Sequence, residues 1–210
     1  MNIKLEMINK LDYEQMIKLI SEVWDFSDYF PNIKAKTAMC KFYLYSSLLG
    51  ATFGQKAVAD GKTVGFLIGK SKKGNKLYYS VPLLMKMLKE FFIIMLHSDF
   101  TSKKKLSDMI TISRFYTISM QKEQLNTKGN IELFVTGKEF QGLGVGKKLL
   151  NAYENYMIEN ECLIYYVQTD SNCNYGFYEY HNFEKIVSES INLKNKAEIV
   201  LYLYLREILK

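Results

Sequence analysis

The sequence predicts an α/β (α+β) fold in which helices flank a central sheet, and three stretches of the chain support this prediction. First, the short apolar run Ile131–Val135 leads through a glycine-rich turn into residues 145–160, where apolar side chains recur at three- and four-residue spacing. This order is typical of a strand, a turn and an amphipathic helix. Second, two strand-like runs meet at Asp60-Gly61, which is a strong hairpin signal. Third, the continuous apolar run Leu163–Val167 suits a central strand.

The length and composition indicate one globular domain. The chain has 210 residues, of which 48% are hydrophobic and 24% charged, so it can bury a full core. Neither internal repeats nor low-complexity linkers divide it, and we expect a single domain over residues 1–210. The net charge of +6 is modest and spread along the chain, so it suits a polyanionic cofactor about as well as nucleic acid.

Signals for metal binding, export and membrane insertion are missing from the sequence. The three cysteines, Cys40, Cys162 and Cys173, are widely spaced without metal-ligand pairing, so we expect no metal site. Residues 1–10 are polar and alternating rather than a signal region. The strongest apolar stretch, Phe91–Leu96, is far too short to span a bilayer. We therefore expect a cytoplasmic protein that does not associate with membranes.

The N-terminal half begins with a strand and two helices. Ile3, Leu5 and Met7 alternate with polar residues, as in a half-buried strand. Asp12 followed by Gln15 resembles a capping box that starts the first helix. The next three elements are a second helix that ends at Gly50 and the two strands of the hairpin: 34–49, 52–59 and 63–70.

The middle of the chain, residues 71–130, reads as mainly helical. Pro82 stands where a helix could start, and apolar side chains follow it at helical spacing. Residues 106–124 suit another helix, although Ile110, Ile112 and Ile118 leave a strand possible, and residues 126–130 suit a turn. The C-terminal part then predicts a short helix near Cys173–His181 and two strands: 183–188 and 198–206.

The glycine-rich turn is a candidate phosphate site, since glycines expose backbone N–H groups at the positive end of a helix. Its residues are Gln141-Gly142-Leu143-Gly144-Val145-Gly146-Lys147. A P-loop would need Ser or Thr after Gly146-Lys147, but Lys148 follows. A dinucleotide fingerprint needs G-x-G-x-x-G, and this motif is one residue short.

Two motifs resemble those of the GCN5-related N-acetyltransferase (GNAT) family. Gln141–Gly146 is similar to the family's Gln/Arg-x-x-Gly-x-Gly/Ala loop, and Asn174–Phe183, about 37 residues after Gln141, resembles its helix ending in Phe-Tyr-Glu-x-x-Gly-Phe. The resemblance covers 1–70 loosely and 131–206 well. It implies the GNAT fold, a central mixed and mostly antiparallel sheet flanked by helices. Residues 71–130 would then be a helical insertion between strands 3 and 4, serving as a lid, a dimer contact, a substrate wall or extra core.

The resemblance also implies roles for individual residues. The main chain of Leu133, Phe134 and Val135 would bind the pantetheine arm of acetyl-coenzyme A, and the loop Gln141–Gly146 with Lys147 would bind its pyrophosphate. The family often has Asn seven positions before its tyrosine; that position is Ser171 here, so Asn174 is our choice for this contact, with helix capping as the alternative.

Catalytic roles follow from the same comparison. Tyr178 matches the family tyrosine that protonates the leaving thiolate, a step suited to a phenol, with a core tyrosine as the alternative. Glu132 is the candidate base, with a structural partnership to a nearby lysine as the alternative. Asp170 and water relays are further candidates. Cys173 is more simply read as structural than as a nucleophile.

The function predicted from this resemblance is an acetyl-coenzyme A-dependent N-acetyltransferase, in which a primary amine attacks the thioester directly without an acyl-enzyme. The alternatives are a non-catalytic acyl-coenzyme A-binding sensor or interaction module and, less favoured, a nicotinamide dinucleotide enzyme. A nucleic-acid role would rest only on the net charge and Lys103–Lys105. We expect a small-molecule or peptide amine acceptor and, since family members often dimerise, a homodimer. The aromatic residues after the first helix are candidates for the acceptor pocket or for core: Trp24, Phe26, Tyr29 and Phe30.

Overall fold

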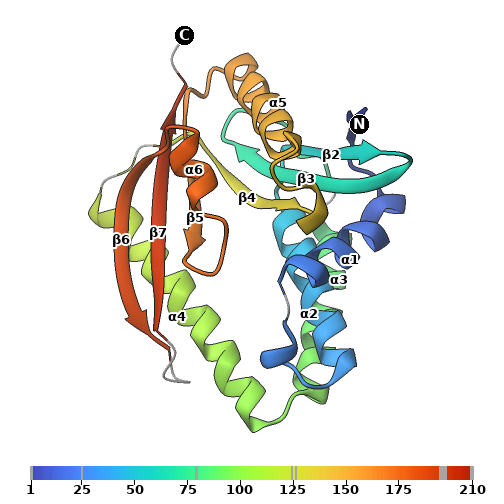
Figure 1. Cartoon of the computed structure of the whole chain (residues 1–210). Helices are drawn as coiled ribbons and strands as arrows, with labels where there is room; N and C mark the ends of the chain where they lie inside the picture. The colour runs from blue at the N-terminus through green and yellow to red at the C-terminus, as the bar shows by residue number, and fades with distance from the viewer. Residues whose placement is uncertain are drawn as a thin grey trace.

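In the described part of the chain, seven strands form one mixed sheet in the order β1-β2-β3-β4-β5-β7-β6 (Figure 1). The computed structural model describes residues 2–24, 26–78, 80–123, 125, 127–193 and 198–208, except the side chains of Asp28 and Lys105. All neighbouring strands are antiparallel except the parallel pair β4–β5. The strands are β1 (Lys4–Met7), β2 (Phe53–Ala59), β3 (Lys62–Ser71), β4 (Gly129–Thr136), β5 (Ile164–Asp170), β6 (Glu184–Asn192) and β7 (Glu198–Glu207).

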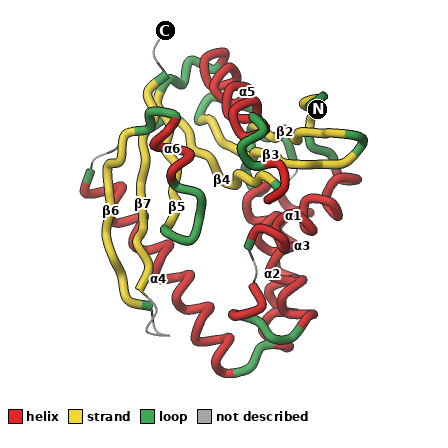
Figure 2. Tube along the Cα trace, viewed as in Figure 1, coloured by secondary structure: helices red, strands yellow, loops and turns green. Residues whose placement is uncertain are grey.

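Helices cover both faces of this sheet (Figure 2). The α-helices are α1 (Tyr13–Val23), α2 (Ile33–Leu48), α3 (Ser80–His97), α4 (Phe100–Lys122), α5 (Val145–Glu159) and the short α6 (Gly176–Tyr180). Single turns of 3₁₀-helix precede α1, α2 and α5: η1 (Lys10–Asp12), η2 (Phe26–Asp28) and η3 (Lys138–Phe140). The mixed, mostly antiparallel sheet with flanking helices confirms the predicted fold class.

The core is divided between the two faces of the sheet. On one face, α5 packs against β2, β3 and β5 through Leu149, Tyr153 and Met157. On the other face, α1 and α2 pack against β3 and β4, with Leu133 and Val135 of β4 in this second cluster. The central strands are therefore buried on both faces, which explains their nearly continuous apolar runs.

The predicted turns at Gly50 and Asp60-Gly61 are confirmed. Asp60 and Gly61 both have positive φ, +49° and +74°, and connect the paired residues Ala59 and Lys62. These values fit the two-residue hairpin turn that the dipeptide favours. Gly50, with φ of +81°, follows the end of α2.

The predicted capping box at Asp12 and Gln15 is wrong. The capping box lies one turn earlier, where the side chain of Asn9 accepts a hydrogen bond from the N–H of Leu11 and that of Asp12 accepts one from Asn9. The Gln15 side chain instead accepts a hydrogen bond from the N–H of Thr63, 3.0 Å away. The spacing of Asp12 and Gln15 in the sequence does not reveal that a 3₁₀ turn precedes α1.

The insertion between β3 and β4 consists of two helices. In place of the expected start at Pro82, α3 already begins at Ser80, and α4 resolves the choice between helix and strand in favour of helix. The predicted turn at 126–130 includes Asn126, which lies outside the described residues, and β4 begins at Gly129. α3 packs along α2, whereas the C-terminal half of α4 lies against β7 through Ile112, Phe115 and Tyr116 (Figure 1).

Candidate functional site

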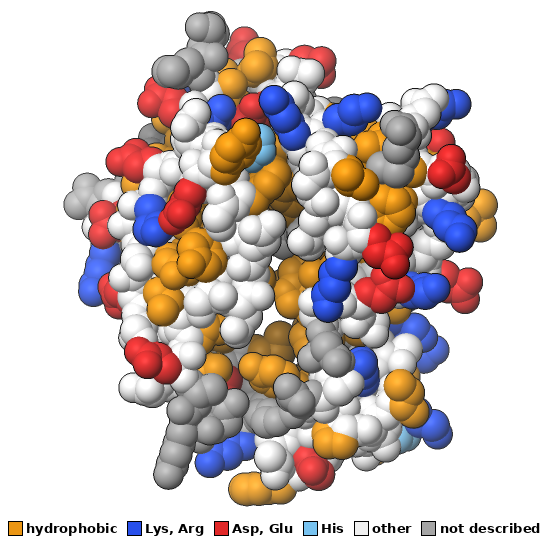
Figure 3. Space-filling view, viewed as in Figure 1, with side chains coloured by type: hydrophobic (Ala, Val, Ile, Leu, Met, Phe, Trp, Pro, Cys, Tyr) orange, Lys and Arg blue, Asp and Glu red, His pale blue; other side chains and the backbone are white. Residues whose placement is uncertain are grey.

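The two central parallel strands separate shortly after they meet. β4 and β5 pair over Gly129–Ile131 and Tyr165–Val167, so within the described residues the β5-facing edge of β4 has no strand partner from Glu132 onward. In the space-filling view the surface is hollowed between the half formed by β5–β7 and the half formed by β1–β4 and its helices (Figure 3). Backbone N–H and C=O groups of β4 therefore remain available at this opening.

The glycine-rich loop lies at the N-terminus of α5. Gly142 and Gly144 have φ of +76° and +80°, which glycine adopts without steric cost. Gly144 is the N-cap residue of α5 and has no side chain that could accept hydrogen bonds from the first amides of the helix. A β carbon on either glycine would meet no heavy atom within 4 Å. The loop is thus an exposed set of N–H donors at the positive end of a 15-residue helix.

Two aromatic residues and one glycine join this loop to β4 and α6. The rings of Phe134 and Phe177 lie edge to face with centroids 5.3 Å apart. A β carbon on Gly146 would lie 3.0 Å from Cε2 of Phe177, so glycine lets the first turn of α5 approach α6 closely. The predicted phosphate loop, the predicted pantetheine strand and the helix that carries Tyr178 therefore meet at one junction.

Tyr178 is buried among other aromatic rings. Its ring stacks on that of Tyr204 and lies edge to face with Phe183, with centroids 5.7 and 5.2 Å apart. Burial raises the pKa of its hydroxyl, and the nearby Cys173 and Tyr43 raise it further. The phenol consequently stays protonated around neutral pH, which is the form that can donate a proton.

The carboxylate of Glu132 forms an ion pair with a lysine. Its Oε1 atom lies 2.7 Å from Nζ of Lys70 and accepts a hydrogen bond from Nδ2 of Asn130. Ile68 pairs with Leu133 and Gly69 with Ile131, so Glu132 is the extra residue of a β-bulge. The bulge explains why Ile131 packs on the α5 face although Leu133 packs on the opposite one. Simple alternation along the strand could not have placed Glu132.

Asp170 ends β5 on the other side of the opening. Its Oδ1 accepts a hydrogen bond from the N–H of Asn172, and its side chain interacts with that of Cys173. Burial raises the pKa of this carboxyl, which the hydrogen bonds only partly offset. Burial and the charge of Asp170 likewise raise the pKa of the Cys173 thiol.

Two tyrosines that sequence reasoning missed complete the group around Asp170. The pKa of Tyr43, on α2, is raised by burial and by the nearby Cys173 and Asp170, and its ring lies 5.6 Å from that of Trp24. Tyr116, on α4, donates a hydrogen bond to the carbonyl oxygen of Thr169. Burial and Asp170 also raise its pKa. No local motif marks either tyrosine, because each reaches the site only through the docking of its helix.

The remaining candidates fall into two groups. Trp24 joins the group at Asp170, whereas Phe26, Tyr29 and Phe30 pack into a core cluster with α2 and the insertion helices. Asn174 is exposed, and its side chain does not cap α6, whose N-cap residue is Tyr175. Ser171, at the family's asparagine position, accepts a hydrogen bond from the N–H of Val200 on β7.

Lys147 and Asn182 lie at the α6 side of the opening. Lys147 is exposed and close enough to His181 to lower the pKa of the imidazole, an effect second to that of burial. Asn182 stands where the family's motif has glycine, and its φ of +58° lies in the left-handed region. Among the described residues, no group of three His, Cys, Asp or Glu side chains could hold a metal ion.

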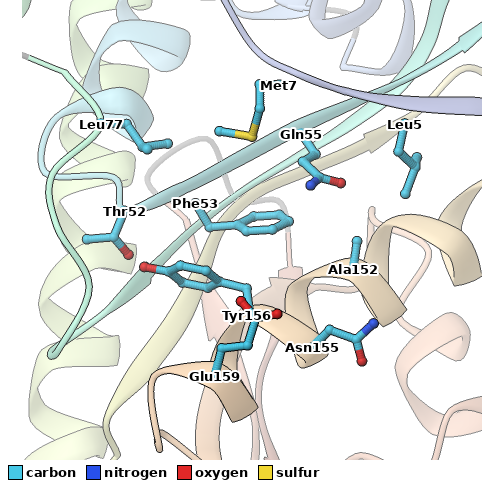
Figure 4. A pocket seen from close by; sticks show the side chains of 10 residues that line it. All are labelled: Leu5, Met7, Thr52, Phe53, Gln55, Leu77, Ala152, Asn155, Tyr156 and Glu159. Atoms are coloured by element: carbon cyan, nitrogen blue, oxygen red, sulfur yellow. The ribbon is translucent and has the colours of Figure 1, made fainter.

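A separate cavity lies away from these residues, between β1–β2 and the C-terminal half of α5 (Figure 4). It has a volume of about 500 Å³ and is lined by Phe53, Gln55 and Tyr156 among others. None of the predicted site residues contributes to its wall. No helix in the described part of the chain has the length and apolar character needed to cross a membrane.

Part of the chain matches a known protein family. Residues 105–183, from α4 through β4, α5, β5 and α6, match the model described as "Acetyltransferase (GNAT) family". This segment contains the glycine-rich loop, Asp170 and Tyr178. A search of curated proteins gives no significant match.

Solved structures share the fold over nearly the whole chain. PH1933 from Pyrococcus horikoshii OT3 is 18% identical, with 100% of both chains covered and a TM-score of 0.62. A GCN5-related N-acetyltransferase (aminotransferase, class II) from Rhodopseudomonas palustris is 11% identical, with 99% of this chain and 97% of that one covered and a TM-score of 0.56. PaiA N-acetyltransferase from Thermoplasma acidophilum, solved in complex with coenzyme A, is 12% identical, with 99% of each chain covered and a TM-score of 0.50.

Proposed function

We propose that this chain is an acetyltransferase of the GNAT family, whose model residues 105–183 match, and that it transfers an acetyl group from acetyl-coenzyme A to a primary amine. One observation carries the proposal. The β4 edge beyond its pairing with β5, the glycine-rich loop and α6, which carries Tyr178, meet through Phe134, Gly146 and Phe177. A strand edge, an anion site and a proton donor are what an acyl thioester with a pyrophosphate would need.

The residues present fit such a donor. The open space beside Gly142 and Gly144 leaves their amides accessible to a pyrophosphate, with the ammonium of Lys147 nearby in the chain. The main chain of Leu133, Phe134 and Val135 would pair with the amides of the pantetheine arm. Acetyl-coenzyme A would supply the electrophilic carbonyl carbon. Backbone N–H groups of β4 would polarise that carbonyl, and Tyr178 would protonate the departing sulfur.

We favour Asp170 over Glu132 as the general base. The carboxylate of Glu132 is neutralised by Lys70, whereas no ion pair is found for Asp170 among the described residues. The raised pKa of Asp170 also makes it a stronger base than an ordinary carboxylate. Asp170 would accept a proton from the incoming ammonium, directly or through water. Glu132 would then hold the Lys70 side chain between β3 and β4.

Direct attack by the amine is favoured over an acyl-enzyme. Cys173 is the nucleophilic side chain nearest to Asp170, but burial and the carboxylate both raise the pKa of its thiol. A thiol that stays protonated is a poor nucleophile. The aromatic side chains of Trp24, Tyr43 and Tyr116 around Asp170 would instead receive the amine of a small molecule or peptide.

Calorimetric titration with acetyl-coenzyme A, with NAD as the control, tests the donor assignment. We expect acetyl-coenzyme A to bind and NAD not to bind. A panel of amines and peptide N-termini, followed by release of free thiol, then tests transfer. Binding without transfer to any amine would contradict catalysis and favour a non-catalytic acyl-coenzyme A-binding module, while binding of NAD alone would contradict the whole proposal.

A further inference from the structure

The solvent-facing side of α3 is apolar along the length of the helix. Seven large apolar side chains on this side are between 40% and 79% exposed. The opposite side of α3 is buried through Leu83, Glu90 and Ile94 and packs along α2. We call the exposed set the outer face of α3: Val81, Leu84, Met85, Leu88, Phe91, Phe92 and Leu96.

The spacing makes these side chains one continuous surface. Successive helical residues are rotated by about 100°, so intervals of three and four residues keep the outer face on one side of the helix. The charged residues of α3 lie off this face. Lys86 extends over the rings of Tyr13 and Tyr45, with Nζ 5.6 and 5.4 Å from their centroids, and Glu90 is buried. Lys89 stands at the edge, where its long side chain can reach solvent.

The apolar area is too large to be an ordinary monomer surface. A large apolar side chain presents on the order of 200 Å² when fully exposed, so the exposed fractions amount to roughly 700 Å². The largest apolar patch on a typical monomer is about 300–600 Å² and is often functional. A stable interface buries about 800 Å² from each partner, so this face is of the size that one partner needs.

We propose that the outer face of α3 binds the same face of a second copy of this chain, with the two helices antiparallel about a twofold axis near Leu88. Such an interface must complement itself. Large apolar residues occur at both ends and at the centre of the face. In an antiparallel pair of α3 helices, apolar side chains would therefore face apolar side chains along the whole contact. The contact would bury the surface that a lone chain leaves in water.

The structure favours a second copy over a lipid surface. A helix that lies in a membrane interface carries a basic face toward the headgroups. In α3 the side opposite the apolar residues is buried in protein, and Lys86 is directed over aromatic rings. The insertion would thus provide an oligomer contact through the side of α3 that points away from α2. This proposal does not depend on the acetyltransferase reaction.

Sedimentation equilibrium on the full chain tests the proposal. The wild type should sediment at twice the 24.5 kDa mass of one chain at micromolar concentration. Leu88→Glu and Phe92→Glu should each raise the dimer dissociation constant at least tenfold. Ile118→Glu provides a matched control, because Ile118 is 54% exposed on the neighbouring helix α4 and lies outside the outer face. Circular dichroism would verify that all variants fold.

Three outcomes would overturn the proposal. The first is a wild-type protein that remains monomeric up to about 100 µM, a range in which interfaces of this size associate. The second is a dimer that persists unchanged in both glutamate variants, which would place the contact elsewhere. The third is a monomer whose outer face binds vesicles of phosphatidylcholine and phosphatidylglycerol and loses this binding in Phe92→Glu.

Discussion

The Nζ atom of Lys70 on β3 lies 2.7 Å from Oε1 of Glu132 on β4, at the bulge where the two strands change register. The same oxygen accepts a hydrogen bond from Asn130. The Glu132 side chain is thus held between β3 and β4 by a lysine and an asparagine. Asp170 stands across the opening without such a partner among the described residues.

Replacing each of the two carboxylates by its amide should have different effects on kcat. We expect Asp170→Asn to lower kcat by about 100-fold or more, the usual contribution of a general base. Glu132→Gln should lower it by less than tenfold, because it leaves the base in place. Steady-state acetylation assays at saturating acetyl-coenzyme A would measure both. The reverse order of effects would return the base role to Glu132.

The pH dependence of the reaction should reflect the environment of Asp170. Burial raises its pKa above the ordinary 3.8, and the active form is the charged one. Activity should therefore be complete above the raised pKa and decline as pH falls through it. A profile of kcat/KM against pH should show this acidic limb in the wild type and in Glu132→Gln. If the acidic limb were unchanged in Asp170→Asn, it would have to arise from the titration of another group.

Tyr178→Phe should separate catalysis from binding. The substitution keeps the ring that packs on Phe183 and Tyr204 but removes the proton donor. We expect kcat to fall about 100-fold while the dissociation constant of acetyl-coenzyme A changes less than threefold. Stopped assays and calorimetry on the same preparation would provide both values. Unchanged turnover would remove Tyr178 from the mechanism and leave it a core tyrosine.

Gly144→Ala should weaken coenzyme binding more than it weakens the fold. Its φ of +80° strains any other residue by about 1 kcal/mol, and a β carbon there would stand beside the loop amides. Gly61→Ala is a matched control, since Gly61 has φ of +74° and equally open surroundings but lies in the β2–β3 turn. Both should lose similar stability in urea, and only Gly144→Ala should raise the dissociation constant tenfold or more. Equal affinities would argue against the loop as the pyrophosphate site.

A buried ion pair should matter more for stability than an exposed one. Asp12 and Lys56 are both buried, and their side chains pair at 2.5 Å, with Glu6 3.3 Å from the same lysine. Asp12→Ala should destabilise the fold by about 2–4 kcal/mol, because it removes the closer partner of a buried ammonium. Lys73→Ala breaks the exposed pair with Glu161 and should leave the urea midpoint unchanged within error. Similar midpoints for the two variants would contradict this difference.

Much of the fold was predictable because its signals are local. The hairpin at Asp60-Gly61 follows from backbone preferences at positive φ, and the strands and helices on either side follow from apolar periodicity. The helix at 106–122 was ambiguous because isoleucines suit either structure. Its conformation depends on packing, since Ile112, Phe115 and Tyr116 lie against β7. The shift of the capping box to Asn9 likewise depends on Asp12 reaching Lys56.

The candidate site was predictable only in part. Gln141–Gly146 and Tyr178 belong to contiguous motifs whose spacing can be read directly, and the structure brings them to one junction. Tyr43 and Tyr116 could not be found in this way, because they come from helices distant in the chain. The preference for Asp170 over Glu132 also required the structure, since the position of Lys70 decides it.

By itself, the sequence determined the order of strands and helices outside residues 106–124, the glycine-rich loop at the start of α5 and the tight turns. Each of these depends on backbone preferences and periodicity among neighbouring residues. Only the tertiary structure decided which carboxylate is neutralised, which tyrosines surround Asp170 and which side of α3 remains uncovered. These features depend on contacts between segments far apart in the chain, whose free energies do not appear in any local pattern.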